Sequence, residues 1–382
     1  MPTLPAIAAA AVIGSIGVNT HIDFNAYGYQ NRGLVAQAIN YLGVKNLRDS
    51  AANPSDVETW PQVARATGAK FDDFIGETSP AGMAAQLALM PRLAQEGVLN
   101  AVEGGNEEDD AYARSQGNSL PFTARFQQRV DAMGRSLGLP VINMSFGSGW
   151  TAANDWHGDY DKVGNLSAYA SYANAHAYPM AGQTTGATIR RLNDDARLAA
   201  ASRPVMTTEI GWNTGGEGPA VRGVVQAVLD AIKDGDAGVY FYALFDDMSG
   251  KYGLMNSDGS PRPAGAALHN FTTLLADGGG RFTPGSLGYS LGGRVGGDET
   301  LLMQKSDGSF WLALWNESAD RHRVVVNLGE VASRIAVFDP VRGTSAVASN
   351  GEAKHVTVEL GNDPLLIEVV SGAAAGTTDT IR

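Results

Sequence analysis

Four short apolar runs of the sequence end in polar side chains that could do chemistry. Glu107 and Glu209 each close one run, and Arg48 closes a third. His176 lies at the end of the fourth, two residues before Tyr178. Two carboxyl groups can divide the roles of proton donor and of base or nucleophile, because neighbouring charges and hydroxyl groups set their pKa values apart.

Each of these residues also has a purely structural explanation. An acidic residue after a strand commonly caps a helix, a histidine commonly makes a structural hydrogen bond, and an arginine commonly pairs with a nearby acid. The joint occurrence of such residues at four strand ends favours a functional site over four separate structural roles.

The elements that must position these residues follow a βα rhythm, in which short apolar runs alternate with longer amphipathic stretches. Strands are predicted at residues 15–21, 44–49, 70–75, 98–103, 140–146, 172–176, 205–209 and 237–245. The clearest helices are predicted at residues 33–42, 80–96, 121–137 and 219–233. The repeat fills residues 14–277, a length typical of an α/β protein with a (β/α)8 TIM barrel.

After residue 277 the pattern changes to glycine-rich turns and short alternating strands. Strands are predicted there at residues 300–304, 310–316, 322–328, 333–338, 354–360 and 365–370. This pattern indicates a small antiparallel β-sandwich domain over residues 278–372. Residues 373–382 are small and polar, which is typical of a flexible tail.

Composition excludes several classes of partner. A formal net charge of −12, with 28 scattered basic residues, disfavours nucleic acid and anionic membranes. The absence of cysteine excludes disulfides and thiolate metal sites, and no apolar run is long enough for a membrane span. We expect a monomer or weak homo-oligomer. We also expect a secreted or periplasmic protein, with the cytoplasm as the alternative, although residues 1–12 lack the basic start of a complete signal peptide.

The order and spacing of the strand-end residues over positions 14–277 resemble those of the clan A glycoside hydrolases. In that clan an Asn-Glu pair closes strand four, a Glu closes strand seven, a His-x-Tyr lies at strand six and an Arg closes strand two. The matching residues here are Asn106-Glu107, Glu209, His176-Ala177-Tyr178 and Arg48. Three positions differ: Gly105 and Glu108 stand where many relatives have Trp and Pro, and Phe245 stands where many relatives end strand eight with a Trp.

The resemblance implies a retaining glycoside hydrolase that cleaves a β-linked oligo- or polysaccharide without a cofactor. Glu107 would be the general acid/base and Glu209 the nucleophile. Strands four and seven lie across the barrel mouth, so the two carboxyl groups are predicted to approach to roughly 5–5.5 Å. Glu103, deeper in its strand, is predicted to be a buried partner of a basic or polar group.

Nine further residues are predicted to bind substrate or support the catalytic pair. Asn106 would bind the sugar 2-hydroxyl, Arg48 and Tyr178 would keep Glu209 ionised, and His176 would hold Glu107 or the sugar. Aromatic rings in strand-end loops could stack on sugar faces or simply pack. The full set is Asn106, Arg48, His176, Tyr178, Trp212, His21, Trp150, Trp156 and Tyr252.

Two other functions stay open. The barrel could bind a polysaccharide without cutting it, although a binding surface has no use for two opposed carboxylates. It could also be a metal-dependent hydrolase, with ligands among Asp109, Asp110, Asp155, His157, Asp159 and Asp161. Residues 155–161 lack the glycine and the later glutamate of a calcium loop, so no metal is expected.

Overall fold

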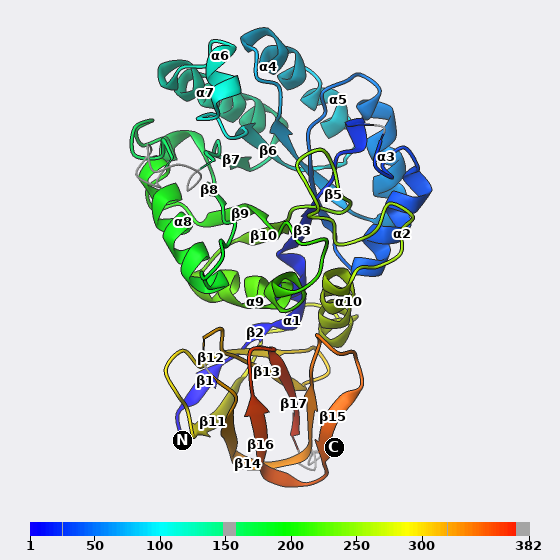
Figure 1. Ribbon diagram of the computed structural model, residues 1–382, viewed down its shortest axis with the longest axis vertical. Helices are drawn as coiled ribbons and strands as arrows, with labels where there is room; N and C mark the ends of the chain where they lie inside the picture. The colour runs from blue at the N-terminus through cyan, green and yellow to red at the C-terminus, as the bar shows by residue number, and fades with distance from the viewer. Residues whose placement is uncertain (25, 148–157, 319, 372–382) are drawn as a thin grey trace, which may run out of the picture. The chain divides into compact units, whose positions relative to one another are not determined.

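A ring of eight parallel strands forms the larger of two compact units, residues 14–269 (Figure 1). The structure is a computed structural model that describes residues 1–24, 26–147, 158–318 and 320–371, apart from the side chains of residues 111 and 112. The strands are β3 Ile16–Asn19, β4 Asn46–Asp49, β5 Lys70–Ile75, β6 Leu99–Gly105, β7 Val141–Ile142, β8 Ala173–His176, β9 Val205–Ile210 and β10 Gly238–Phe241.

Each strand pairs in parallel with its neighbours in the order β7-β6-β5-β4-β3-β10-β9-β8. A parallel bridge between Ile142 and Tyr172, beside β7 and β8, brings the two edges of the sheet together. This arrangement confirms the predicted (β/α)8 barrel. It also places the carboxyl ends of all eight strands at one end of the ring, which is where barrel active sites lie.

Helices surround the strands, as Figure 1 shows. They are α2 Arg32–Leu42, α3 Asp56–Thr67, α4 Pro80–Leu87, α5 Met90–Gln95, α6 Ala111–Ser115, α7 Leu120–Leu137, α8 Thr185–Ala199 and α9 Pro219–Asp234, and α10 Pro263–Leu275 follows. Their ends carry the expected local signals: the Asn31 side chain accepts a hydrogen bond from the Leu34 amide at the start of α2, and Gly43 ends α2 with a φ of 73°. No helix in the described ranges combines the length and apolar character needed to cross a bilayer.

The prediction of one helix over residues 80–96 is wrong, because the structure has two helices there. Pro91 lies in the first turn of α5 and has no amide hydrogen to donate to the carbonyl of Leu87, where α4 ends. The strand predicted at 140–146 is also too long, since pairing stops at Ile142. Helices α3 and α8 were not among the predicted elements.

The ring of Tyr240 leaves no room for a side chain at position 17. An added Cβ there would lie 2.2 Å from the ring of Tyr240, which reaches across the barrel interior from β10 to the neighbouring strand β3. The Tyr240 hydroxyl donates a hydrogen bond to the buried carboxyl group of Asp72 on β5. The Tyr240 ring is therefore buried inside the barrel with its hydroxyl group hydrogen-bonded.

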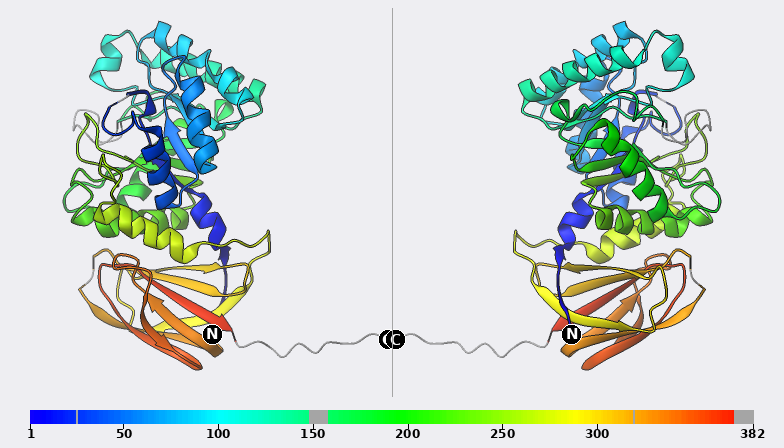
Figure 2. Two further views of the ribbon diagram at one scale, coloured as in Figure 1. Left: turned by 90° about the vertical axis from the view of Figure 1, so that its right-hand side faces the viewer. Right: turned by 90° about the vertical axis from the view of Figure 1, so that its left-hand side faces the viewer.

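The second unit combines residues 1–13 with the chain from residue 270 onward. It consists mainly of β-strands, together with most of helix α1 Ala9–Gly14 and the end of α10. Its strands are β1 Thr3–Pro5, β2 Ile7–Ala8, β11 Ser286–Gly292, β12 Glu299–Gln304, β13 Phe310–Trp315, β14 His322–Phe338, β15 Ala346–Asn350, β16 Ala353–Leu360 and β17 Leu365–Ser371. They enclose a hydrophobic core that includes Leu312, Leu314 and Val326. Figure 2 shows the strands of this unit from two further sides. This confirms the predicted sandwich-like fold, while residues 373–382 lie outside the described residues.

Two features of this unit differ from the sequence prediction. The N-terminal strands β1 and β2 join it by pairing with β11 and β12, which their short lengths gave no reason to expect. The separate strands predicted at 322–328 and 333–338 are one strand, β14. A glycine between two apolar runs, such as Gly329, is typical of a turn. Here the chain stays extended, and only its register with β16 shifts between Asn327 and Ala332.

Candidate active site

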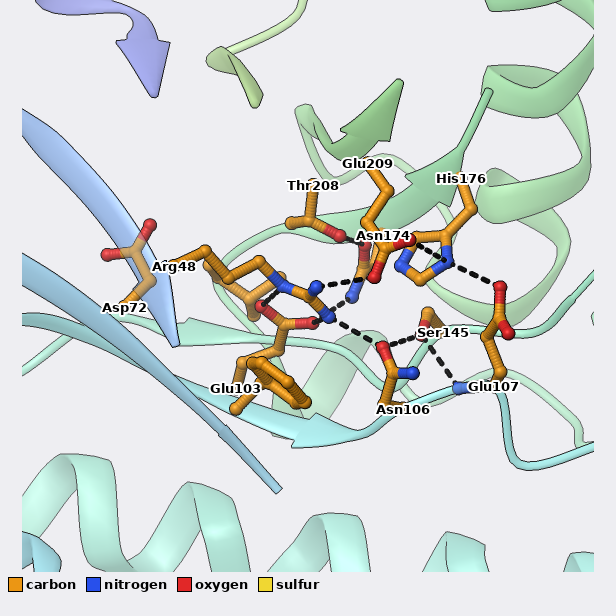
Figure 3. Close-up of polar contacts among 12 residues, drawn as sticks. Arg48, Asp72, Glu103, Asn106, Glu107, Ser145, Asn174, His176, Thr208 and Glu209 are labelled. Atoms are coloured by element: carbon orange, nitrogen blue, oxygen red, sulfur yellow. Dashed lines mark hydrogen bonds and ion pairs between the residues drawn. The ribbon is translucent and has the colours of Figure 1, made fainter. Parts of the chain in front are cut away.

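Polar side chains from strands β4, β6, β8 and β9 converge at the carboxyl ends of the barrel strands (Figure 3). Arg48 lies on β4, His176 ends β8 and Glu209 lies near the end of β9. Glu107 follows the end of β6 by two residues. The sequence-predicted residues therefore meet in one site, as the barrel topology requires.

Arg48 is fully buried and uses every N–H of its guanidinium group. Its Nε and one Nη2 hydrogen donate to the two oxygens of Glu103, at 2.9 and 2.7 Å. Nη1 donates to the Asn19 side chain at 2.9 Å and to Glu209 at 2.6 Å. The second Nη2 hydrogen goes to Asn106 at 2.7 Å. The prediction that Glu103 is a buried partner of a basic group is confirmed.

The carboxyl group of Glu209 is buried and held at both oxygens. Oε1 accepts from Arg48, and Oε2 accepts from the Tyr178 hydroxyl at 2.5 Å. Burial alone would raise the pKa of Glu209, but the charges of His176 and Arg48 and the two hydrogen bonds outweigh it and lower the pKa below its usual value. Glu209 is therefore ionised at neutral pH.

Glu107 is more open to solvent, with 30% of its side chain exposed against 8% for Glu209. Its Oε1 lies 2.9 Å from Nδ1 of the buried His176. Burial lowers the pKa of His176, but the charge of Glu209 and the hydrogen bond and charge of Glu107 raise it above its ordinary value. The imidazole can thus donate to one carboxylate while facing the other, whose Oε2 is 3.6 Å away.

The backbone at Glu107 adopts a conformation that is rare for residues other than glycine, with a φ of 45°. Its amide N–H donates to the Ser145 hydroxyl at 3.0 Å. Strained backbone of this kind persists only where the surrounding structure holds it in place, and it concentrates at functional sites. Here it directs the Glu107 side chain toward His176, as Figure 3 shows.

A cavity of about 240 Å³ opens above these groups. Its lining residues are His21, Phe74, Asn106, Glu107, Tyr178, Glu209, Tyr242, Ser249 and Tyr252. An aromatic wall forms where the ring of Tyr252 meets Tyr178 and Tyr242 edge to face, with centroids 5.7 and 5.5 Å apart. The cavity is therefore lined by two carboxyl groups on one side and by aromatic rings on another.

The remaining sequence-predicted site residues divide into three groups. His21 and Tyr252 line the cavity. Trp212 lies against α9, where its ring would be 2.5 Å from a Cβ added at Gly223, and it is not among the lining residues. Trp150 and Trp156 lie outside the described residues.

The candidate metal ligands named from the sequence do not gather into one site within the described ranges. Asp159 pairs with Arg114 and Lys162, and Asp109 accepts a hydrogen bond from the Gly147 amide. Asp155 and His157 lie outside the described residues. Two other groups of described residues lie close enough together to hold a metal ion. One consists of Glu107, His176 and Glu209, and the other of His21, Asp23 and Asp49.

Sequence analysis missed two important residues of the site. Tyr242 was assigned to a strand predicted to run to residue 245, but β10 ends at Phe241 and Tyr242 is the first residue after it. Phe245, which the resemblance singled out, is fully buried. Asn174 donates to Glu103 at 2.8 Å, and two-residue alternation from His176 along β8 could have identified it.

Comparison with protein-family models finds no match for the sequence, and comparison with curated protein sequences finds none either. Comparison with solved structures does find similar folds. One is a family 39 glycoside hydrolase from the gut symbiont Bacteroides cellulosilyticus WH2, with 16% identity and a TM-score of 0.63, covering 96% of this chain and 83% of the other.

Two further similar structures are glycoside hydrolases as well. The family 39 enzyme from Xanthomonas axonopodis pv. citri has 11% identity and a TM-score of 0.64, covering 97% and 96% of the two chains. The catalytic domain of family 30 xylanase C from Talaromyces cellulolyticus has 15% identity and a TM-score of 0.57, covering 97% and 98%. At these identities the likeness shows the fold.

Proposed function

We propose that this protein is a retaining glycoside hydrolase that cleaves a β-glycosidic bond in an oligo- or polysaccharide. The observation that carries the proposal is the spacing of the two carboxyl groups: an oxygen of Glu107 and an oxygen of Glu209 lie within 4.8 Å of each other. Retaining enzymes hold their carboxyl groups roughly 5–5.5 Å apart, whereas inverting enzymes need roughly 6.5–9.5 Å to admit a water. The similar folds of family 39 and family 30 glycoside hydrolases support the same activity.

Glu209 serves as the nucleophile in this proposal. It is ionised, because the charges and hydrogen bonds around it lower its pKa. It is also held at both oxygens by Arg48 and Tyr178, so little reorganisation precedes attack. The carboxylate oxygen forms a bond to the anomeric carbon as the bond to the leaving oxygen breaks, which gives a glycosyl-enzyme.

Glu107 serves as the general acid and then as the general base. It gives its proton to the leaving oxygen in the first step, and in the second it removes a proton from the water that displaces Glu209 from the anomeric carbon. Its greater exposure suits a group that must meet both a leaving group and water. His176 orients the carboxyl group through the 2.9 Å contact at Nδ1.

Asn106 binds the sugar 2-hydroxyl in this proposal. The side-chain oxygen of Asn106 is already occupied by Arg48, so the amide N–H₂ is the group left to face the cavity that Asn106 lines. The N–H₂ can donate to the 2-hydroxyl oxygen, which leaves the hydroxyl hydrogen to be donated to the Glu209 carboxylate, a bond that strengthens as positive charge develops on the sugar ring.

Covalent trapping tests the proposal. The protein is incubated with activated 2-deoxy-2-fluoro β-glycosides, whose fluorine slows hydrolysis of the glycosyl-enzyme. The intact mass of the protein should then rise by the mass of one fluorosugar. Peptide mapping should then place the added mass on Glu209. The Glu209→Gln variant should take up no label, while Asp258→Asn, which changes an exposed carboxylate elsewhere, should be labelled as the wild type is. Label on another residue would refute the assignment.

A further inference from the structure

The backbone of Glu107, as well as its carboxyl group, is held in place by the surrounding protein. With a φ of 45° the backbone lies in the left-handed region, which is strained for a residue that has a side chain. A residue stays in that region only while its surroundings hold it there. The position of Glu107 therefore depends on contacts that the chain around it makes, and not only on those of its carboxyl group.

Ser145 makes three hydrogen bonds to the segment that contains Glu107. It lies three residues beyond the end of β7. Its amide donates to the Gly105 carbonyl at 3.0 Å, and its carbonyl accepts from the Glu108 amide at 3.1 Å. Its hydroxyl oxygen accepts from the Glu107 amide at 3.0 Å. Two of the three bonds use backbone atoms of Ser145, and the one to Glu107 itself depends on the side chain.

The hydroxyl group of Ser145 is buried between two residues of the site. Oγ also lies 3.5 Å from Asn106 Oδ1, and Figure 3 shows Ser145 between the Asn106 side chain and the backbone nitrogen of Glu107. Ser145 is completely buried. Within the described ranges the Glu107 amide has no other acceptor. Without the hydroxyl group the amide would lose its partner, and the backbone could turn to a less strained conformation.

A turn of the Glu107 backbone would move its carboxyl group. Oε1 now lies 2.9 Å from His176 Nδ1, and an oxygen of Glu107 lies within 4.8 Å of an oxygen of Glu209. Both distances depend on the direction in which the side chain leaves the backbone. Misplacing a reacting group by about 1 Å can cost roughly 100-fold in rate, so the hydrogen bond from the Glu107 amide matters for proton transfer.

We propose that Ser145 is a positioning residue for the acid/base, because its hydroxyl group holds the Glu107 amide and thereby keeps the Glu107 carboxyl group within reach of the glycosidic oxygen. This inference rests on the proposed glycosidase function. Ser145 is not among the described residues that line the cavity, so it acts through the backbone of Glu107 rather than by touching the sugar.

Ser145→Ala removes the hydroxyl group and keeps the rest of the side chain. Glu107 protonates a poor leaving group in the first step and activates water in the second. On a phenyl β-glycoside the variant should therefore lose roughly tenfold or more in kcat/KM. On the 2,4-dinitrophenyl β-glycoside of the same sugar, kcat/KM should stay within about twofold, because that leaving group needs no proton. There kcat and KM should fall together, since hydrolysis of the glycosyl-enzyme becomes slower.

A merely structural role for Ser145 gives a different kinetic result. Loss of folded protein would lower kcat by the same factor on both glycosides and leave both KM values unchanged, and that result would overturn the inference. Ser171→Ala is the matched control, because the Ser171 hydroxyl accepts a hydrogen bond from the Val141 amide at 3.1 Å, at the start of the same strand β7. Ser171 does not line the cavity, and this variant should keep the wild-type constants on both glycosides.

Hydrogen exchange gives a second measurement that needs no substrate. Deuterium uptake is followed by mass spectrometry, with fragmentation that resolves the amides of residues 107 and 108. The Glu107 amide should exchange slowly in the wild-type protein and roughly tenfold faster or more in Ser145→Ala, while the amides of α9 exchange alike in both.

Fast exchange of the Glu107 amide in the wild type, or an unchanged rate in the variant, would overturn the inference. If the variant exchanges faster but the wild type hydrolyses no glycoside, the proposed function is refuted, and the hold of Ser145 on the Glu107 backbone is supported.

Discussion

Replacing Tyr178 with phenylalanine removes a single oxygen atom from the candidate active site. That oxygen donates the 2.5 Å hydrogen bond to Oε2 of Glu209, while Arg48 continues to hold Oε1. The ring of Tyr178 packs edge to face against Tyr242 and Tyr252, contacts that phenylalanine keeps. The change therefore tests how much one hydrogen bond contributes to keeping Glu209 ionised.

The expected size of the effect follows from the charge on the acceptor. A hydrogen bond to an ionised group contributes about 1.5–3 kcal/mol, which corresponds to about 1–2 pKa units. The bond lowers the pKa of Glu209, so its loss should raise that pKa and leave the nucleophile protonated over a wider acidic range. Activity then requires a higher pH.

The assay is the pH profile of kcat/KM on an activated aryl glycoside. In Tyr178→Phe the acidic limb should move to higher pH by about 1–2 units. Tyr252→Phe is the matched control, because Tyr252 lines the same cavity and the structure of the described residues has no hydrogen bond from it to Glu209. The acidic limb of this variant should stay in place. An unmoved limb in Tyr178→Phe would refute the reasoning that this hydroxyl helps to ionise the nucleophile.

Three further outcomes are expected. Glu107→Gln should lose roughly 100-fold or more in kcat/KM on glycosides with poor leaving groups and much less on those with activated leaving groups, and equal losses on both would count against its acid role. Gly17→Ala should destabilise the barrel by about 1–3 kcal/mol in urea unfolding, because its Cβ would meet the Tyr240 ring, whereas Gly14→Ala meets no atom within 4 Å and should not. Burial raises the pKa of Asp73 to about 8, so between about pH 4 and pH 8 the folded state keeps a proton that the unfolded state releases. The free energy of unfolding should therefore fall as the pH rises through this range. Asp73→Asn should remove this part of the pH dependence, and an unchanged dependence would show that Asp73 is ionised in the folded protein.

The sequence predicts the barrel because its strands are short apolar runs that alternate with longer amphipathic stretches. The strand predicted at residues 70–75 has the same bounds as β5. The expectation that polar residues at strand ends meet in a barrel correctly placed Arg48, Glu107, His176 and Glu209 in one site. These residues are specified by local patterns: an apolar run, its end, and a polar side chain at that end. The joint pattern carries more information than any one residue.

Other features depend on long-range contacts that local patterns do not encode. The five hydrogen bonds of Arg48 join residues from β3, β4, β6, the loop after β6, and β9. His21 and Tyr242 are separated by more than half of the chain, and they meet through the pairing of β3 with β10. The left-handed backbone of Glu107 likewise has no signal in its residue type.

The anomeric configuration of the first-formed product tests the central claim most directly. Proton NMR of a β-glycoside during its first minutes of hydrolysis, before mutarotation, distinguishes the two anomers of the released sugar. Because an oxygen of Glu107 and an oxygen of Glu209 lie within 4.8 Å of each other, we expect the β-anomer to form first, through two successive displacements. If the α-anomer forms first, water attacks directly, and Glu209 is a general base rather than a nucleophile.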